Sequence, residues 1–185
     1  PMQRDLVLRA SNGDHDAFAS LATNAYGRLH RTAQLILRRE DLASDAVQEA
    51  LTSAWLHVRA VRDPDRFDAW LNRLVVRACY QELRRAKRGP IQVQVDSING
   101  PGIDDSTSAL ADRDQLERGF QHLSVEHRAV LVVHHYLGLP DAEGATVLEV
   151  PMGTYKSRLN RAHLSLRAAL EADARVAGIG QESLA

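Results

Sequence analysis

The stretch PMGTYKSRLNRAHLSLRAAL, residues 151–170, carries the strongest structural signal in this sequence of 185 residues. Apolar or small side chains recur through it every three or four residues, as they do along one face of an α-helix. These positions are Tyr155, Leu159, Ala162, Leu166 and Ala169. Pro151 suits the first turn of such a helix, because the N–H that proline lacks would go unpaired there. The stretch therefore predicts a long helix that packs along one face.

The opposite face of this predicted helix is polar and basic. It carries Lys156, Ser157, Asn160 and Arg161. Between Pro151 and Arg167 the sequence contains several basic residues and no acidic one. Such side chains near a helix N-terminus can reach phosphates and base edges. The alternative is a basic, solvent-exposed face on an ordinary helical bundle.

The residues before this stretch favour the DNA-binding interpretation. They predict a short helix around Asp141–Leu148, joined to the basic helix by a tight connection at Val150 and Pro151. A short helix, a tight connection and a longer basic helix are typical of a helix-turn-helix, which lays its second helix in the major groove. Together with the acid-free span, this order makes DNA binding the preferred interpretation.

Two further helices are predicted upstream of the helix-turn-helix. The first covers Asp112–His122. The second follows Ser124, a good N-cap, with Glu126 in the first turn to oppose the helix dipole. Gly138 is placed to end this helix, because glycine readily adopts the left-handed conformation found there.

A different kind of segment separates two helical blocks. From Gly89 to about Ala109 the sequence lacks helical periodicity and is rich in Gly, Pro, Asp and Ser. A loop of this length is unusual inside one compact domain, so we expect a linker and a domain boundary. The expected fold class is all-α, with two small helical domains joined by a flexible linker. The predicted order is a first domain, linker, second domain and frayed tail, at residues 1–88, 89–111, 112–175 and 176–185.

The first domain is expected to contain three long helices. An apolar stripe from Asp14 continues to Leu37, and a second helix starts near Asp41. Pro64 interrupts the chain, since proline disfavours continuation of the helix before it. A third helix runs from Phe67 into a basic cluster. Its predicted inward face carries Phe67, Trp70, Leu71, Leu74, Ala78 and Leu83, and the cluster contains Arg84, Arg85, Lys87 and Arg88.

The composition narrows the class of protein. The chain is 44% hydrophobic, 25% charged and only 5% aromatic, which favours helices. Its single cysteine, Cys79, excludes an internal disulfide and a multi-thiolate zinc site and is compatible with a reducing cytosol. No stretch approaches the roughly 20 apolar residues of a membrane span, and no export signal is visible. We therefore expect a cytoplasmic protein.

The net charge of the chain is −1, but basic residues are concentrated in local segments that can bind phosphate.

One face of the helix that starts near Asp41 is polar and partly acidic. It carries Asp45, Gln48, Glu49 and Thr52. This face is compatible with a solvent-exposed stripe, with carboxylate chemistry or metal binding, and with a protein-docking surface. No histidine accompanies it at ligand spacing. A docking surface is the preferred functional interpretation, and no metal or cofactor is expected.

The helix from Phe67 to Arg88 is expected to present a second basic face. This outward face is predicted to carry Asn72, Arg73, Val76, Arg77, Tyr80, Arg84 and Lys87. Basic groups with an interleaved aromatic ring suit a single strand whose bases can stack. The alternative is a solvated helix end that complements the helix dipole.

The histidines are expected to have packing or surface roles rather than to bind a metal. His134 and His135 are adjacent and point about 100° apart on a helix, so they cannot easily share an ion. His122, His127 and His163 are isolated in the sequence.

Four of these segments resemble conserved segments of the extracytoplasmic-function (ECF) group of the sigma-70 family, in the family's order. The segments are residues 45–55, 67–85, 123–131 and 151–162. The last is the most specific match, because it is similar to the helix that recognises the −35 promoter element. The resemblance covers about residues 14–170, with a linker where the family has one. It implies a sigma factor, a non-catalytic subunit that gives RNA polymerase its promoter specificity in transcription initiation.

The resemblance also implies roles for individual residues. Those expected to contact the polymerase clamp are Asp45, Gln48 and Glu49. The loop from Val61 to Arg66, with Arg62 and Arg66, would hold a flipped −10 base. The residues expected along the melted −10 strand are Asn72, Arg73, Arg77, Tyr80 and Arg84. Those expected to read the −35 duplex are Lys156, Ser157, Arg158, Asn160 and Arg161. Implied partners are core RNA polymerase, promoter DNA and an anti-sigma protein.

Three positions depart from the family pattern. Family members usually carry Arg-Asn at Val76-Arg77, so different −10 contacts are expected. An aliphatic residue is usual at Gly144, and glycine there should weaken the short helix by about 1 kcal/mol. Glycine is usual at Glu149, where we expect either a strained positive φ or a different turn.

Two other classes of protein are alternatives. A metal-dependent hydrolase would need ligands that converge from several helices, and the sequence shows none. A stand-alone helix-turn-helix regulator with a ligand-sensing N-terminal block would leave the acidic face and the Arg84 cluster without a role.

Overall fold

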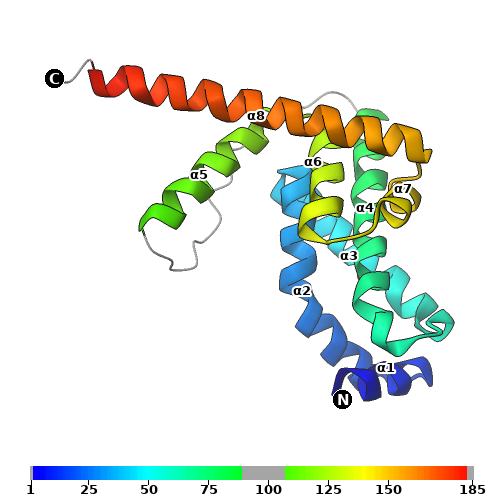
Figure 1. Ribbon diagram of the computed structural model, residues 1–185. Helices are drawn as coiled ribbons and strands as arrows, with labels where there is room; N and C mark the ends of the chain where they lie inside the picture. Colours follow the sequence, from blue (N-terminus) through cyan, green and yellow to red (C-terminus); the bar gives the residue numbers. More distant parts are fainter. Residues whose placement is uncertain (1, 89–106, 183–185) are drawn as a thin grey trace. The chain divides into compact units, whose positions relative to one another are not determined.

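The structure, a computed structural model, describes the backbone of residues 2–88 and 107–182 and the side chains of residues 2–86 and 114–175. The chain divides into two compact units, residues 1–98 and 99–185, and each is described by itself. The described residues form helices and no strands, which confirms the all-α prediction (Figure 1). None of the described helices combines the length and apolar character needed to cross a bilayer.

The first unit contains the three predicted long helices and one that was not predicted. They are α1 (Met2–Ser11), α2 (His15–Leu37), α3 (Glu40–His57) and α4 (Phe67–Arg88), with short 3-10 turns η1 (Val58–Ala60) and η2 (Pro64–Arg66) before α4. Asp14 caps α2 by accepting a hydrogen bond from the Ala17 N–H at 3.0 Å. Arg38 ends the helix in the left-handed region, with a φ of 54°.

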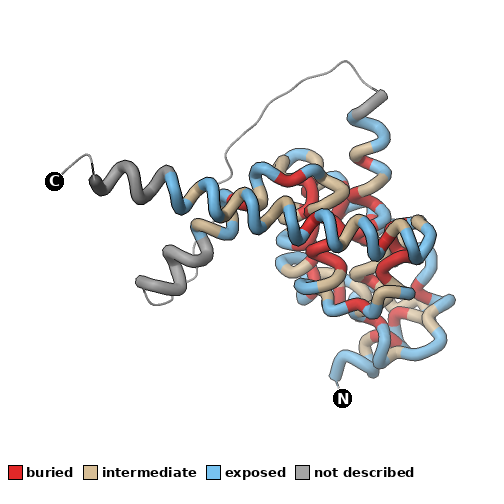
Figure 2. The backbone as a smooth tube through the Cα atoms, turned by 45° about the horizontal axis from the view of Figure 1, so that its top comes forward, coloured by how far each residue is buried: buried red, intermediate tan, exposed pale blue. Residues whose placement is uncertain are grey.

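Three helices of the first unit, α2, α3 and α4, pack on one another, and α1 packs on α2. Figure 2 colours the backbone by burial and marks the core positions in red. On α3 the buried side chains are alanines except for Val47; the alanines are Ala43, Ala46, Ala50 and Ala54. Small side chains let neighbouring helix backbones approach closely, so α3 can contact both α2 and α4. Cys79 is fully buried, and burial raises the pKa of its thiol, which stays protonated and unreactive.

The inward face of α4 is rotated from the predicted one. Phe67, Leu71 and Ala78 are buried as expected, but Val75, Val76 and Cys79 complete the core, whereas Trp70, Leu74 and Leu83 are only half-buried. The assignment of Val76 to the outward face is therefore wrong. The prediction placed the buried face around the bulky Trp70 and Leu74. Because α4 packs against both α2 and α3, the face that it buries is wider than a single apolar stripe and includes Val75, Val76 and Cys79.

The second unit contains α5 (Thr107–Gln121), α6 (Val125–Leu131), the π-helix η3 (Val132–Tyr136), α7 (Asp141–Val147) and α8 (Met152–Glu182). Helix α5 begins at Thr107, inside the segment assigned to the linker; residues 89–106 lie outside the described residues. Helix α8 continues to Glu182, so the helix extends into the predicted tail.

The predicted helix ends of the second unit are confirmed. Ser124 Oγ accepts a hydrogen bond from the His127 N–H at 3.2 Å, and Glu126 lies in the first turn of α6. Gly138, with a φ of 62°, follows the π-helix and turns the chain toward α7. The Pro151 carbonyl accepts from the Tyr155 N–H at 2.9 Å and so opens α8.

Candidate nucleic-acid interface

A single aromatic side chain joins the two helices of the helix-turn-helix. Tyr155 of α8 is fully buried and lies directly over Gly144 of α7. A Cβ atom at Gly144 would lie 2.6 Å from the Tyr155 hydroxyl oxygen and 2.7 Å from its ring carbons. Such distances are far inside van der Waals contact. Glycine at this position therefore makes room for the ring, and its weak helix propensity is offset by the packing it allows.

The Tyr155 hydroxyl contributes packing and no hydrogen bond. It is buried and has no hydrogen-bond partner in the described part of the chain. Burial, with a smaller contribution from the charge of Asp141, raises the pKa of Tyr155 to about 12. The phenol is therefore neutral at physiological pH, as a side chain in an apolar contact must be.

The turn between α7 and α8 adopts the first of the two conformations expected at Glu149, a positive φ. Glu149 has a φ of 54°, in the left-handed region that non-glycine residues rarely adopt. Its N–H donates to the Thr146 carbonyl at 3.2 Å, and the next N–H, of Val150, donates to the Ala145 carbonyl at 3.0 Å. These bonds close the end of α7 and fix the direction in which α8 starts.

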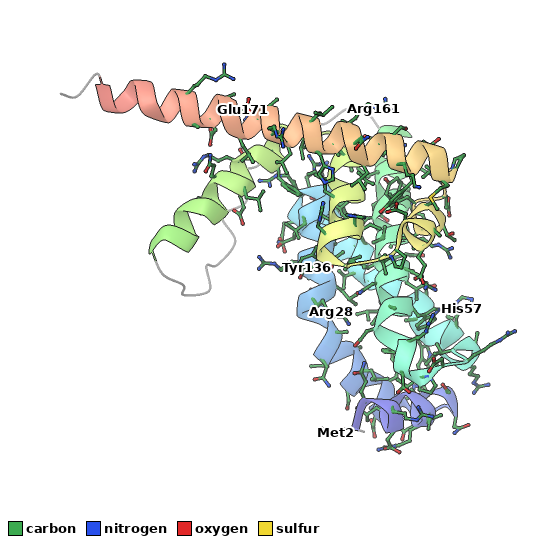
Figure 3. The ribbon with its side chains drawn as sticks, viewed as in Figure 1. Met2, Arg28, His57, Tyr136, Arg161 and Glu171 are labelled. Atoms are coloured by element: carbon green, nitrogen blue, oxygen red, sulfur yellow. The ribbon has the colours of Figure 1, made fainter. Side chains whose placement is uncertain are left out.

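The predicted reading face of α8 is exposed. Lys156, Ser157, Asn160 and Arg161 are all exposed, Arg158 is half-buried, and Tyr155 and Ala162 are buried on the other side. Arg161, labelled in Figure 3, donates from Nη2 to Ser157 Oγ at 3.3 Å and from Nε to the Ser157 carbonyl at 3.2 Å. Less than two turns of helix therefore present a group of hydrogen-bond donors to solvent.

Helix α4 of the first unit also presents a basic face. At 100° per residue, Arg73, Arg77, Tyr80 and Arg84 fall within an arc of about 60° on α4. Arg77 and Arg84 are exposed, whereas Arg73 and Tyr80 are half-buried. The Lys87 side chain lies outside the described residues.

Asn72 lies apart from the other predicted −10 residues. It is about 100° around α4 from Arg73, on the side that meets α2. Arg28 of α2, labelled in Figure 3, donates one N–H to Asn72 Oδ1 and another to Asp68 Oδ1, the latter at 2.7 Å. Sequence reasoning missed Arg28, since no local pattern relates residues that are 44 positions apart.

The loop before α4 is held by side chains of its own and of α1. Asp63 caps the turn by accepting from the Asp65 N–H at 3.0 Å, and its carboxylate lies 3.8 Å from Arg66. Arg4 of α1 pairs with Asp65 at 2.6 Å. Arg62 and Arg66 are both exposed. The unpredicted α1 therefore supports the loop expected to hold a flipped base.

The acidic face of α3 is exposed, as the docking interpretation requires. Asp45, Gln48, Glu49 and Thr52 all lie at the surface, and Thr52 donates its hydroxyl to the Gln48 carbonyl at 2.8 Å. The described residues contain no group of three or more His, Cys, Asp or Glu side chains that could hold a metal. The hydrolase alternative thus finds no support in this face.

Comparison with known families accounts for both units. The sigma-70 region 2 model matches residues 21–89, and the sigma-70 region 4 model matches residues 113–166. The ECF RNA polymerase sigma factor SigM of Mycobacterium tuberculosis is 35% identical over 162 residues, 88% of this chain and 81% of the relative. This chain belongs to the ECF group of the sigma-70 family.

More distant relatives and solved structures agree. The ECF sigma factor SigW of Bacillus subtilis is 23% identical to this chain, and the match covers 90% of this chain and 95% of SigW. The structure of CnrH in complex with the cytosolic domain of CnrY has a TM-score of 0.61 at 25% identity and covers 94% of this chain and 99% of CnrH. The sigma factor RpoE of Bartonella quintana, solved with the anti-sigma factor NepR, shares the fold, with a TM-score of 0.64 at 22% identity over 84% of this chain and 98% of RpoE.

As an ECF sigma factor, the chain acts in promoter recognition and transcription initiation and is not an enzyme. The regulator alternative is set aside, because the first unit matches region 2 rather than a ligand-sensing domain.

Proposed function

We propose that this sigma factor binds promoter DNA at two places, the −10 element with residues 1–88 and the −35 element with residues 112–175. The observation that supports the proposal most strongly is the row of exposed hydrogen-bond donors on α8, the helix that follows the turn at Glu149. In a helix-turn-helix, the N-terminal residues of the second helix contact base edges in the major groove. The residues assigned to the −35 duplex are Lys156, Ser157, Arg158, Asn160 and Arg161.

The −10 assignment follows the exposed face of α4 and the loop before it. Arg73, Arg77, Tyr80 and Arg84 share one face, and basic groups beside an aromatic ring suit a strand with unstacked bases. Arg62 and Arg66 extend this surface into the loop. Asn72, at the edge of this face, is still assigned to the −10 strand, and its side chain is held by the hydrogen bond from Arg28. The buried Val76 takes no part in it.

Three partners complete the proposed function. Asp45, Gln48 and Glu49 contact the clamp of core RNA polymerase, which fits an exposed acidic helix face. An anti-sigma protein binds this chain, as CnrY binds CnrH and NepR binds RpoE. The cytoplasm is the proposed location, because RNA polymerase and promoter DNA reside there.

Reconstituted transcription tests the proposal. Purified core polymerase and this chain are supplied with a library of genomic promoters from the source bacterium, and the RNA 5′ ends are mapped. We expect new start sites that share −35 and −10 elements, and we expect Glu49→Lys to reduce polymerase binding without unfolding the chain. If the chain never shifts the start sites while it binds core polymerase, the promoter assignment is wrong. If it does not bind core polymerase, the clamp assignment is wrong.

A further inference from the structure

Two histidines that are 28 positions apart in the sequence meet on the second unit. The Nε2 atoms of His135, on the π-helix η3, and His163, on α8, lie 2.7 Å apart. Their ring centroids are 5.0 Å apart, and both side chains are exposed. The expectation that His163 is isolated is therefore wrong, because the fold pairs it with His135. Neither residue is used by the promoter-binding surfaces.

The π-helix presents two successive histidines to two different helices. His134 Nδ1 lies 3.3 Å from Asp141 Oδ1 at the start of α7, whereas His135 meets His163 of α8. The rings of His134 and His135 stand edge to face, with centroids 4.6 Å apart. Partial desolvation, followed by the charges of His134 and His163, lowers the pKa of His135. A lowered pKa favours the neutral imidazole, which is the form that binds a metal ion.

We propose that His135 and His163 form a two-histidine site for a divalent late transition-metal ion, of the Ni²⁺ or Cu²⁺ type. With metal–nitrogen bonds of about 2.0–2.1 Å, two ligands at 90° lie about 2.9 Å apart, whereas tetrahedral ligands lie about 3.3 Å apart. The 2.7 Å between the Nε2 atoms in the metal-free chain is a hydrogen-bond distance, and a small separation of the rings would bring them to either spacing. Cu²⁺ and Ni²⁺ are the favoured ions because square-planar or octahedral ions can fill their other positions with water, whereas Zn²⁺ sites carry three or four protein ligands.

The remaining coordination positions are open to water. The described residues contribute no third His, Cys, Asp or Glu to this pair, and both rings face solvent. At 2.7 Å without an ion, one ring donates its Nε2 proton to the lone pair of the other. Binding would require the donating ring to move its proton from Nε2 to Nδ1, by exchange with water, so that both rings stay neutral and both Nε2 lone pairs face the ion.

The site borders the reading face of α8. His163 lies about 160° around the helix from Arg161, but only about 60° from Asn160 and about 20° from Lys156, and it is farther from the helix N-terminus than any of the three. A bound ion would therefore lie next to the assigned DNA contacts. The ion would tie α8 to η3 and raise the stability of the second unit, because it binds only when the two histidines are brought together.

Calorimetric titration of NiCl₂ into the untagged full-length chain tests the proposal, together with thermal unfolding. We expect one Ni²⁺ per chain, tighter binding of Ni²⁺ than of Zn²⁺, and a raised Tm that EDTA reverses. His135→Gln and His163→Gln should each abolish both the binding and the Tm shift while circular dichroism stays unchanged. His122→Gln and His127→Gln, on the same unit, serve as matched controls and should bind like the wild type.

Three results would overturn the proposal. Absence of binding to the folded wild-type chain would mean that the pair only shares a proton. Unchanged binding in both His135→Gln and His163→Gln would place the ion elsewhere. Tighter binding of Zn²⁺ would contradict the assigned geometry.

Discussion

The two units support their basic faces in different ways. In the second unit, the reading face of α8 is fixed by apolar packing, since Tyr155 fills the space over Gly144 on the opposite side of the helix. In the first unit, the basic face of α4 is bordered by polar contacts that Arg28 and Arg4 bring from other helices. A packed contact does not tolerate one extra methyl group, whereas exposed ion pairs can be lost at small cost. We therefore expect the two units to differ sharply in their response to mutation.

The largest effect is expected at the packed contact. Gly144→Ala places a methyl group 2.6–2.7 Å from Tyr155, and overpacking this close should cost about 3 kcal/mol. Alanine gains about 1 kcal/mol of helix propensity in α7, so the second unit should lose about 2 kcal/mol of stability. Gly153→Ala is the matched control on α8, because a Cβ atom there would meet no other atom within 4 Å and alanine favours helix. It should stabilise the unit by up to about 1 kcal/mol. Thermal unfolding measures both changes, and equal Tm values for the two variants would refute the packing argument.

The next effect concerns DNA binding rather than stability. Arg161→Ala should weaken binding to the cognate −35 element by about 1–3 kcal/mol and leave the Tm nearly unchanged, because Arg161 is exposed. Arg175→Ala, an exposed arginine farther along α8, is the control. Electrophoretic mobility shift with holoenzyme on matched and mismatched −35 sequences measures the difference. Equal losses for the two variants would show that Arg161 contributes only general charge.

A smaller effect is expected at the polar contact of the first unit. Arg28→Met removes both hydrogen bonds to α4 and keeps much of the apolar stem. Because the Arg28 and Asp68 side chains are 33% and 51% exposed, the loss of stability should be only about 1 kcal/mol or less. Denaturant unfolding at low and high salt measures it, and the loss should shrink at high salt. A loss as large as that of Gly144→Ala would remove the contrast between the units.

The smallest effect at neutral pH is expected for Tyr155→Phe. The hydroxyl has no hydrogen-bond partner in the described part of the chain, so its removal should leave stability unchanged or slightly higher. Above pH 10 the variants should diverge. The unfolded phenol ionises near its ordinary pKa of 10, whereas the folded one, with a pKa of about 12, does not, so wild-type stability should fall between these values. Stability curves for the wild type and Tyr155→Phe that stay parallel through this window would contradict the buried-phenol assignment.

The sequence predicted local features well and features formed by distant residues poorly. The cap at Ser124 and the turn at Gly138 depend on a few consecutive residues, and both were predicted. The positive φ at Glu149 was one of two alternatives that the sequence left open. The role of Gly144 was misjudged, because helix propensity says nothing about a ring that arrives from another helix. Val76 was misplaced for a related reason, since the number of helices packed on α4 decides how wide its buried arc is.

The candidate site residues follow the same division. The exposed face of α8 could be derived from periodicity, because buried and polar positions alternate regularly along one helix. Arg28 contacts Asn72, 44 positions away, and His135 contacts His163, 28 positions away. The local sequence around one residue of such a pair does not indicate which distant residue it contacts. The short α1 was missed because it is too short for its apolar spacing to stand out, yet it supplies Arg4 to the loop before α4.

The single buried cysteine has a practical consequence for studies of this molecule in solution. Since Cys79 is shielded and its thiol remains protonated, the native chain should react slowly with maleimides. A cysteine introduced at an exposed position of each unit, such as Ser20 and Ala172, would then accept a dye selectively. A donor and acceptor pair attached in this way would report, by energy transfer, how the spacing of the two units changes as polymerase and promoter are added.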